Sequence, residues 1–173
     1  METYIPLNSI NSDLDRKTLR IRLDKAKTDN TRLSEYMELC HKHGMTTMLV
    51  TNGTLPKVLE KLDTLPTQLY VSVDAPNKQV FDEICKPKWN SGAWHQFEKT
   101  IDLLPSLDTR VVCRHTMVKG KNMADEHISQ YASLDLRADP DYIECKGYVH
   151  VGHSRDNLGA ENEKDKKIKK KNF

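Results

Sequence analysis

Short apolar runs separated by helical patterns organise the middle of this chain. Residues 48–50 are Met-Leu-Val and end at Thr51-Asn52-Gly53, and residues 69–73 are Leu-Tyr-Val-Ser-Val and end at Asp74-Ala75-Pro76. Runs of this length, bounded by turn residues, are typical of strands that are buried on both faces. Pro56 opens a helical pattern between them. The stretch therefore predicts parallel strands joined by a helix.

The same reasoning extends the pattern along the chain. We expect helices at about residues 31–43, 93–104 and 123–136, with further helices opening at Pro56 and Pro76. Four neighbouring parallel strands are expected, with helices on one side, at residues 46–50, 68–73, 109–118 and 142–151. Leu19, Ile21 and Leu23 alternate with arginines, which allows one short exposed strand. The predicted fold class is α/β, with about four parallel strands and outer helices.

Composition divides the chain into three parts. The 173 residues suit one domain, with 37% hydrophobic and 30% charged residues and a formal charge of +2. We expect an irregular segment at 1–30, a folded body at 31–158 and a lysine-rich disordered tail at 159–173. No apolar run approaches the roughly 20 residues that span a bilayer, and no basic segment precedes an apolar one at the N-terminus. We therefore expect a soluble cytoplasmic protein without a membrane partner.

Polar residues follow the two apolar runs at the points where each strand should end. Thr51, Asn52, Ser72 and Asp74 occupy these positions. Ligands of parallel α/β proteins gather at the carboxyl ends of strands, so these residues are binding candidates by position. Helix capping and turn formation explain the same residue types equally well.

The two later strands each carry a polar face. Arg114 and Thr116 share one face of residues 109–118, and Glu144 and Lys146 share one face of residues 142–151. An arginine in mid-strand needs an anion, which is a ligand or a structural ion-pair partner. A polar face suits a wet cavity or a solvated edge strand. A lysine beside a carboxylate can act as a proton donor, a Schiff-base nucleophile or a carboxylate anchor.

The four cysteines form no local metal motif. Cys40, Cys85, Cys113 and Cys145 are far apart in the sequence, and each lies in an apolar segment. We expect buried reduced thiols rather than metal ligands.

Five segments, in this order, resemble the radical-SAM domain of the TYW1 family, the tRNA 4-demethylwyosine synthases, in its archaeal form. They are LVTNGTLP, PTQLYVSVDAP, Ile84-Cys85-Lys86-Pro87, TRVVCRHTMVKGKNM and PDYIECKGYVHVGHSR, and the resemblance covers residues 33–158. It implies part of a (β/α)6 barrel in which a [4Fe-4S] cluster cleaves S-adenosyl-L-methionine. The implied reaction is the lyase step of wybutosine biosynthesis that condenses N1-methylguanosine in tRNA-Phe with pyruvate.

The resemblance also implies roles for individual residues. Those near S-adenosyl-L-methionine would be Thr51, Asn52, Ser72, Asp74, Arg114 and Thr116. Glu144 and Lys146 would be catalytic and face the substrate, although the resemblance leaves open which lysine contacts pyruvate.

Two features of the family are missing from this sequence. The family binds its cluster through a Cys-x3-Cys-x2-Cys loop, which this sequence lacks, and LDKAKTDNT stands where a Gly-Glu-Pro segment is expected. Three neighbouring thiolates hold the iron of such clusters. We therefore expect a truncated chain that is inactive alone, does not hold the cluster and needs a complementing N-terminal fragment. The alternative is a catalytically dead remnant that acts as a scaffold or a tRNA-binding module.

Overall fold

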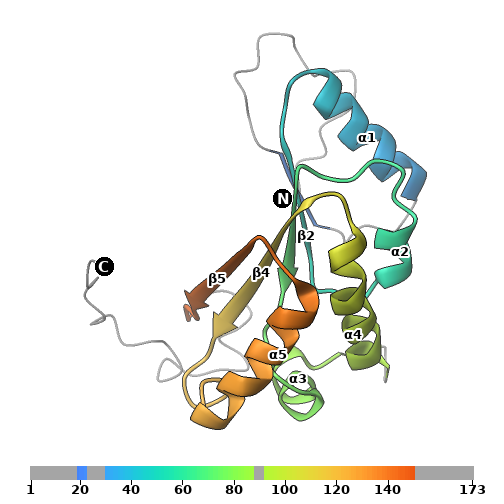
Figure 1. Ribbon diagram of the computed structural model, residues 1–173. Coiled ribbons are helices and arrows are strands. Elements are labelled where there is room, and N and C mark those ends of the chain that lie inside the picture. The colour runs from blue at the N-terminus through green and yellow to red at the C-terminus, as the bar shows by residue number, and fades with distance from the viewer. Residues whose placement is uncertain (1–18, 23–29, 88–91, 151–173) are drawn as a thin grey trace.

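The fold is built on a parallel β-sheet. The computed structural model describes residues 19–22, 30–87 and 92–150 (Figure 1). Every neighbouring pair of strands is parallel, so the predicted α/β class and the predicted neighbouring strands are confirmed. Five strands lie side by side in chain order: β1 (Leu19–Arg22), β2 (Thr47–Thr51), β3 (Gln68–Ser72), β4 (Arg110–Met117) and β5 (Tyr142–Gly147).

The described helices gather on one side of this sheet (Figure 1). The opposite face of the sheet carries no helix in the described part of the chain. The helices are α1 (Asn30–Lys42), α2 (Pro56–Glu60), α3 (Lys78–Cys85), α4 (Ala93–Leu103) and α5 (Ile128–Ala138), with short 3-10 helices η3 (Leu104–Ser106) and η4 (Asp125–His127).

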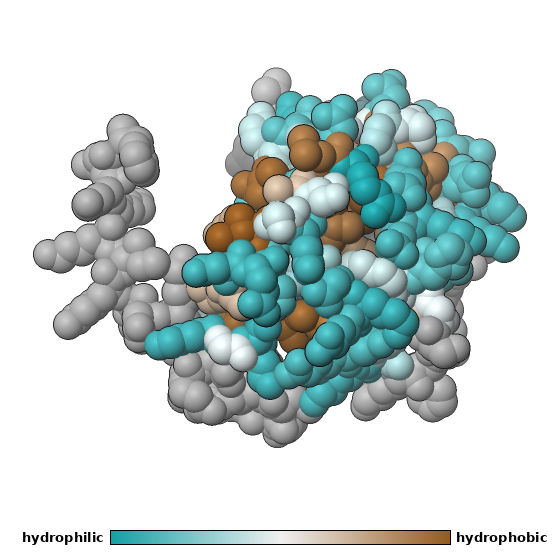
Figure 2. Space-filling model, turned by 60° about the horizontal axis from the view of Figure 1, so that its bottom comes forward, coloured by the Kyte–Doolittle hydropathy of each residue, from teal (hydrophilic) through white to brown (hydrophobic). Residues whose placement is uncertain are grey.

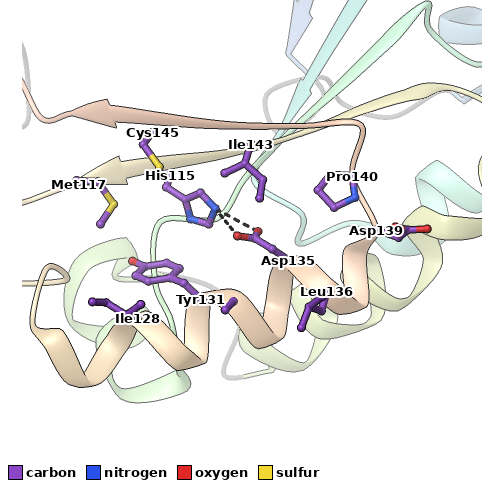
Figure 3. Close-up of a pocket in the computed structure, with 11 residues that line it drawn as sticks. His115, Met117, Ile128, Tyr131, Asp135, Leu136, Asp139, Pro140, Ile143 and Cys145 are labelled. Carbon is purple, nitrogen blue, oxygen red and sulfur yellow. Dashed lines mark hydrogen bonds and ion pairs between the residues drawn. The ribbon is translucent and has the colours of Figure 1, made fainter. Parts of the chain in front are cut away.

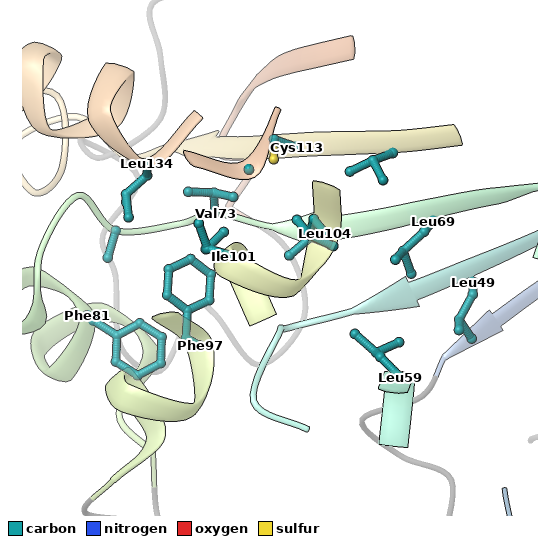
Figure 4. Close-up of a cluster of buried hydrophobic side chains, with 14 of the residues drawn as sticks. Leu49, Leu59, Leu69, Val73, Phe81, Phe97, Ile101, Leu104, Cys113 and Leu134 are labelled. Carbon is teal, nitrogen blue, oxygen red and sulfur yellow. The ribbon is translucent and has the colours of Figure 1, made fainter. Parts of the chain in front are cut away.

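The hydrophobic core lies between the sheet and this helix layer (Figure 4). Leu69 and Val71 of β3 are fully buried there against residues such as Phe97 of α4. Burial of each large apolar side chain contributes about 1.5–3 kcal/mol. Because side chains alternate along a strand, Tyr70 and Ser72 point to the other, helix-free face.

A glycine makes the turn after β2 possible. Gly53 has φ of +74°, and a Cβ atom there would lie 2.9 Å from Cδ2 of Phe97. The hydroxyl of Thr100 donates a hydrogen bond of 2.6 Å to the Gly53 carbonyl. The chain thus turns tightly against α4, which fixes the direction in which β2 ends.

Several boundaries differ from the prediction. β1 joins the sheet beside β2, which makes five strands rather than four. Helix α3 begins at Lys78 because the Asn77 side chain caps it by accepting a hydrogen bond from the Val80 N–H. Strand β5 ends at Gly147 rather than at residue 151, and Tyr148 then turns inward and is buried.

The expectation of four buried thiols is half right. Cys40 and Cys113 are buried, whereas Cys85 and Cys145 are exposed. Cys85 ends α3 and Cys145 lies on β5, where residues 142–146 are all exposed. The predicted tail at 159–173 and residues 1–18 lie outside the described residues. In the described part, no helix is both long and apolar enough to cross a membrane.

Candidate functional site

Two rows of polar side chains cross the helix-free face of the sheet. Ser72 of β3 is in register with Arg114 of β4, and Arg114 is in register with Glu144 of β5. One pleat further along, Thr116 is in register with Lys146. Residues in register share a face, and neighbouring strands lie about 4.8 Å apart. The fold therefore brings these five predicted residues together.

Asp74 joins the same group at the carboxyl end of β3. Its Oδ1 accepts a hydrogen bond of 3.1 Å from the backbone N–H of Thr116, so it bridges β3 to β4. Burial raises the pKa of the Asp74 carboxyl, and the hydrogen bonds from Thr116 and the charge of Arg114 oppose that rise. The structure thus adds a second acidic group, beside Glu144, to a face that also carries Arg114 and Lys146.

Asn122 supports this end of the sheet, although the sequence did not mark it. Its side chain is fully buried and donates hydrogen bonds to the carbonyls of Asp74 (2.8 Å) and Thr116 (2.9 Å). Its Oδ1 accepts from the Val118 N–H at 2.7 Å. Asn122 therefore clamps the ends of β3 and β4. Its signal in the sequence was weak, because an asparagine after a strand usually shapes a turn.

Arg114 has an unsatisfied donor in the middle of the polar face. Its Nε is buried and has no hydrogen-bond partner. Its guanidinium carbon lies 5.9 Å from the ring centroid of Tyr70, within the range of a cation–π contact. A buried N–H without an acceptor is costly and uncommon, so this arrangement favours an anionic partner that reorients the side chain. Tyr70 is a second residue that sequence reasoning missed.

Thr51 and Asn52 do not join these rows. The Thr51 side chain is buried, and its hydroxyl accepts a hydrogen bond of 3.1 Å from the Gly53 N–H. Asn52 is exposed, and its Oδ1 accepts hydrogen bonds from the N–H and hydroxyl of Thr54. Both residues shape the turn after β2, and their role in binding the cofactor stays a prediction.

The cysteines do not approach a cluster-binding arrangement. All four lie on described residues, on α1, α3, β4 and β5. Burial raises the pKa of the Cys113 thiol to about 12, with a further contribution from Asp135, so this thiol resists forming a thiolate. Among the described residues, no group of three or more Cys, His, Asp or Glu side chains could hold a metal ion. The residues present therefore do not fit a [4Fe-4S] cluster.

An α/β protein with a parallel sheet, helices on one side and rows of polar side chains on the other is the class that this fold and site define. The radical SAM superfamily model matches residues 8–132, and the model for wyosine base formation matches residues 137–163. Together they span the described sheet. The chain therefore belongs to the radical SAM superfamily and is a radical-SAM domain of the TYW1 type.

Curated relatives carry the name tRNA 4-demethylwyosine synthase. The protein of Pyrococcus horikoshii is 41% identical over 133 residues, covering 75% of this chain and 38% of the relative. That of Methanocaldococcus jannaschii is 36% identical over 148 residues, covering 86% and 45%. That of Saccharomyces cerevisiae is 35% identical over 127 residues, covering 72% and 15%. The chain thus spans less than half the length of each of these relatives.

Two solved structures resemble the fold. "Structure of TYW1 with a lysine-pyruvate adduct bound" has a TM-score of 0.67 and 31% identity, and the match covers 84% of this chain and 45% of that one. "Crystal structure of archaeal TYW1" has a TM-score of 0.58 and 30% identity, covering 75% and 43%. The sheet described above is therefore part of a TYW1-type barrel.

Proposed function

We propose that this chain supplies the substrate-facing part of a tRNA 4-demethylwyosine synthase in wybutosine biosynthesis. In this proposal, Lys146 binds pyruvate and the neighbouring polar rows hold the other ligand groups. The observation that carries the proposal is the register of Thr116 with Lys146 beside the row of Ser72, Arg114 and Glu144. A TYW1 structure with a lysine-pyruvate adduct, similar to this fold, supports it.

The chemistry of the lysine follows from its neighbours. The amine of Lys146 attacks the keto carbon of pyruvate, water leaves, and a C=N bond forms. Glu144 lies two residues away on the same face of β5 and is the group that takes the ammonium proton and returns it to the departing hydroxyl. The guanidinium of Arg114, in register with Glu144, is the cation that holds a carboxylate in place.

S-adenosyl-L-methionine fits the remaining part of this face. Ser72 and Asp74 would accept hydrogen bonds from its ribose hydroxyls. When bound to a complete enzyme of the family, this cofactor supplies radical chemistry. The role of Thr51 and Asn52 is then indirect, since they shape the loop that follows β2.

The cysteine ligands of the cluster would have to come from another polypeptide segment. The four cysteines of this chain lie on four separate elements, so this sequence does not form the thiolate triad that such a cluster needs. We include in the proposal a complementing N-terminal segment that brings these ligands. On its own, the chain described here binds substrate and is inactive.

Trapping the imine tests the proposal. The chain is incubated with pyruvate and sodium borohydride, whose hydride reduces the C=N bond to a stable secondary amine. Peptide mapping by mass spectrometry is expected to find the adduct on Lys146. Lys146→Met should abolish it, whereas Lys57→Met, which alters an exposed lysine on α2, should leave it unchanged.

Two results would contradict the assignment. Adducts spread over many lysines, in proportion to their exposure, would mean that no site selects pyruvate. Equal labelling of wild type and Lys146→Met would assign pyruvate to another lysine. If Arg114 holds the carboxylate of pyruvate, Arg114→Met should raise the pyruvate concentration needed for half-maximal adduct formation by about tenfold.

A tRNA-binding role without chemistry is the second candidate function. It is favoured by the separation of the cysteines and by the lysine-rich residues 161–173. Binding of tRNA that weakens steeply with salt, and that disappears when residues 161–173 are deleted, would support it. Pyruvate trapping at Lys146 would argue for the first candidate, because a purely tRNA-binding module has no need of that site.

A further inference from the structure

Tyr70 lies where the helix-free face of the sheet changes from apolar to polar. It is in register with Val50 of β2 and Val112 of β4, which share this face and are buried. One pleat toward the carboxyl end, Ser72 and Arg114 begin the polar rows. The half-buried ring of Tyr70 therefore stands between apolar neighbours and the first cation of the site.

The side chain of Arg114 extends toward this ring. Arg114 pairs with Ser72, so Tyr70 is its diagonal neighbour on β3. Such a neighbour is offset by about 7 Å along the strand and about 4.8 Å across the sheet, which a long side chain can span. The guanidinium carbon lies 5.9 Å from the centroid of the Tyr70 ring, within the range of a cation–π contact.

Arg114 stays unpaired although two carboxylates are near it. Glu144 is in register with it on β5, and its charge opposes the rise in the pKa of the Asp74 carboxyl. Within the described part of the chain, the guanidinium forms no hydrogen bond or ion pair with either carboxylate, and its Nε is buried without an acceptor. A salt bridge would occupy the N–H donors, whereas a cation–π contact leaves them for another anion.

β4 is fixed from behind at the residue that follows Arg114. Nε2 of His115 lies 3.1 Å from both carboxylate oxygens of Asp135 on α5, and Nδ1 lies 3.0 Å from the Val73 carbonyl (Figure 3). These contacts tie β4 to α5 and to the end of β3. The backbone of Arg114 is thus held in place, so the direction of its side chain depends on its contacts on the polar face.

The end of the molecule toward which β4 runs is largely hydrophilic. Figure 2 brings this end forward and shows hydrophilic side chains over much of it, with apolar ones among them. A small carboxylate that reaches the polar face from water gives up part of its hydration shell there. A cation with unoccupied N–H donors replaces that hydration best when it is already in position.

We propose that Tyr70 is a positioning residue for the carboxylate of a 2-oxo acid. The inference rests on the proposed function, in which Lys146 attacks the keto carbon and Arg114 holds the carboxylate. The ring of Tyr70 keeps the guanidinium from closing on Glu144 or Asp74, and the N–H donors turn to the substrate when it binds. Tyr70 thereby makes the site select a 2-oxo acid over a neutral ketone of the same size.

Borohydride trapping on Lys146 with two ketones tests this selection. One is pyruvate, and the other is pyruvamide, in which a neutral amide replaces the carboxylate. Tyr70→Leu should raise the pyruvate concentration for half-maximal adduct formation by about three- to tenfold and leave that for pyruvamide unchanged. Tyr70→Met is a second apolar variant with the same expected result, should the leucine variant not fold. Tyr70→Phe keeps the ring and should stay within about twofold of wild type.

Two further variants separate positioning from general damage. Tyr36→Leu makes the same change at a half-buried tyrosine of α1, in the helix layer, and should alter neither concentration. Tyr70→Leu added to Arg114→Met should cause no further loss for pyruvate, because the ring acts through the guanidinium.

Four outcomes would overturn the inference while leaving the proposed function intact. They are an unchanged pyruvate dependence in Tyr70→Leu, an equal shift for pyruvate and pyruvamide, a loss in Tyr70→Phe as large as that in Tyr70→Leu, and additive losses in the double variant. An equal shift for both ketones would mean that Tyr70 only supports the fold. Absence of any adduct on Lys146 in the wild-type chain would instead contradict the proposed function, and the inference with it.

Discussion

At the scale of single residues, His115 is a buried polar side chain that connects three elements of the fold. It is 4% exposed and both of its ring nitrogens are engaged, because one faces the Val73 carbonyl and the other faces Asp135. It therefore ties β3, β4 and α5 together directly behind the polar rows.

Removing the Asp135 carboxylate should be costly. Asp135→Ala is expected to lower the free energy of unfolding by about 1–3 kcal/mol, because it leaves a buried ring nitrogen of His115 without its hydrogen-bond partner. Asp135→Asn should cost less, since its amide oxygen still accepts one hydrogen bond. Asp102→Ala, which breaks an exposed pair with Arg137, should cost only about 0–1 kcal/mol. Urea unfolding measures all three, and equal losses for Asp135→Ala and Asp102→Ala would refute a structural role of the buried pair.

Asp74 should make stability depend on pH. Burial raises the pKa of its carboxyl, so the folded chain holds this proton more tightly than the unfolded chain does. Its contribution to stability is fully present below the ordinary pKa of 3.8 and is lost as the pH rises through the raised, folded pKa. Asp74→Asn removes this dependence. The unfolding free energy of Asp74→Asn, measured relative to wild type, should therefore increase as the pH rises above about 4. A difference that stays constant with pH would show that Asp74 titrates normally.

At the scale of elements, the close approach of the turn after β2 to α4 depends on a glycine, which has no side chain. Gly53 and Gly44 both have positive φ, but only Gly53 is close to another group, since a methyl group added there would lie 2.9 Å from Phe97. Gly44 has nothing within 4 Å of such a methyl group. Substituting Gly44 therefore tests backbone strain alone, whereas substituting Gly53 tests backbone strain together with a steric contact.

Alanine at these two positions should have different costs. Gly44→Ala is expected to lower the free energy of unfolding by about 1–2 kcal/mol through backbone strain alone. Gly53→Ala should lower it by about 2–4 kcal/mol, because Phe97 must also move. Denaturant unfolding measures the free energy of unfolding of both single variants and of a double variant that combines Gly53→Ala with Phe97→Leu. The combined variant should recover part of the loss, and an identical cost for both alanines would rule out the contact with Phe97.

The sequence predicted the orientation of side chains well where its pattern allowed only one interpretation. In β4, Arg114 and Thr116 alternate with Cys113 and His115, and the structure places the polar pair on the open face and buries the other pair. In β2, residues 48–50 are apolar on both faces, so alternation could not show that Thr51 points into the core. Its role in the turn became visible only from its hydrogen bond.

Long-range pairing explains what the sequence could not show. The alternation of Leu19, Ile21 and Leu23 with arginines allowed a short strand here, but its place in the sheet is defined by the parallel pairing of β1 with β2. The end of β5 is also set by a distant partner, because the Tyr148 N–H donates to the Met117 carbonyl just where the strand stops. Asn122 and Tyr70 join the site through contacts with residues far along the chain.

At the scale of the whole molecule, the sheet separates two kinds of surface. The face that carries Ser72, Arg114 and Lys146 is polar and open, and the helix layer packs the core behind it. Ser72 and Arg114 therefore stand on strands whose other side is packed, whereas the other side of β5, which carries Glu144 and Lys146, is exposed. Such backing is what holds ligand-binding groups in fixed positions.

The same architecture keeps the four thiols apart. Cys113 of β4 and Cys40 of α1 are both buried, and burial raises the pKa of each thiol. Cys85 and Cys145 are exposed on α3 and β5. Three of these sulfurs could converge on one iron–sulfur cluster only if α1, α3 or the sheet moved, which would expose the fully buried core. The cost of that exposure exceeds the marginal stability of an ordinary domain.

We therefore expect that these 173 residues, reconstituted anaerobically with iron and sulfide, hold no stable [4Fe-4S] cluster and do not cleave S-adenosyl-L-methionine. The Pyrococcus horikoshii relative, treated in parallel, is the positive control for the procedure. Absorbance spectra and iron content test the cluster, and chromatography of methionine and 5′-deoxyadenosine under dithionite tests the cleavage. A bound cluster together with both products would show that the thiols converge after all. Cys113→Ser and Cys145→Ser would then identify which of them are ligands, since loss of either thiolate from a three-thiolate set should empty the site.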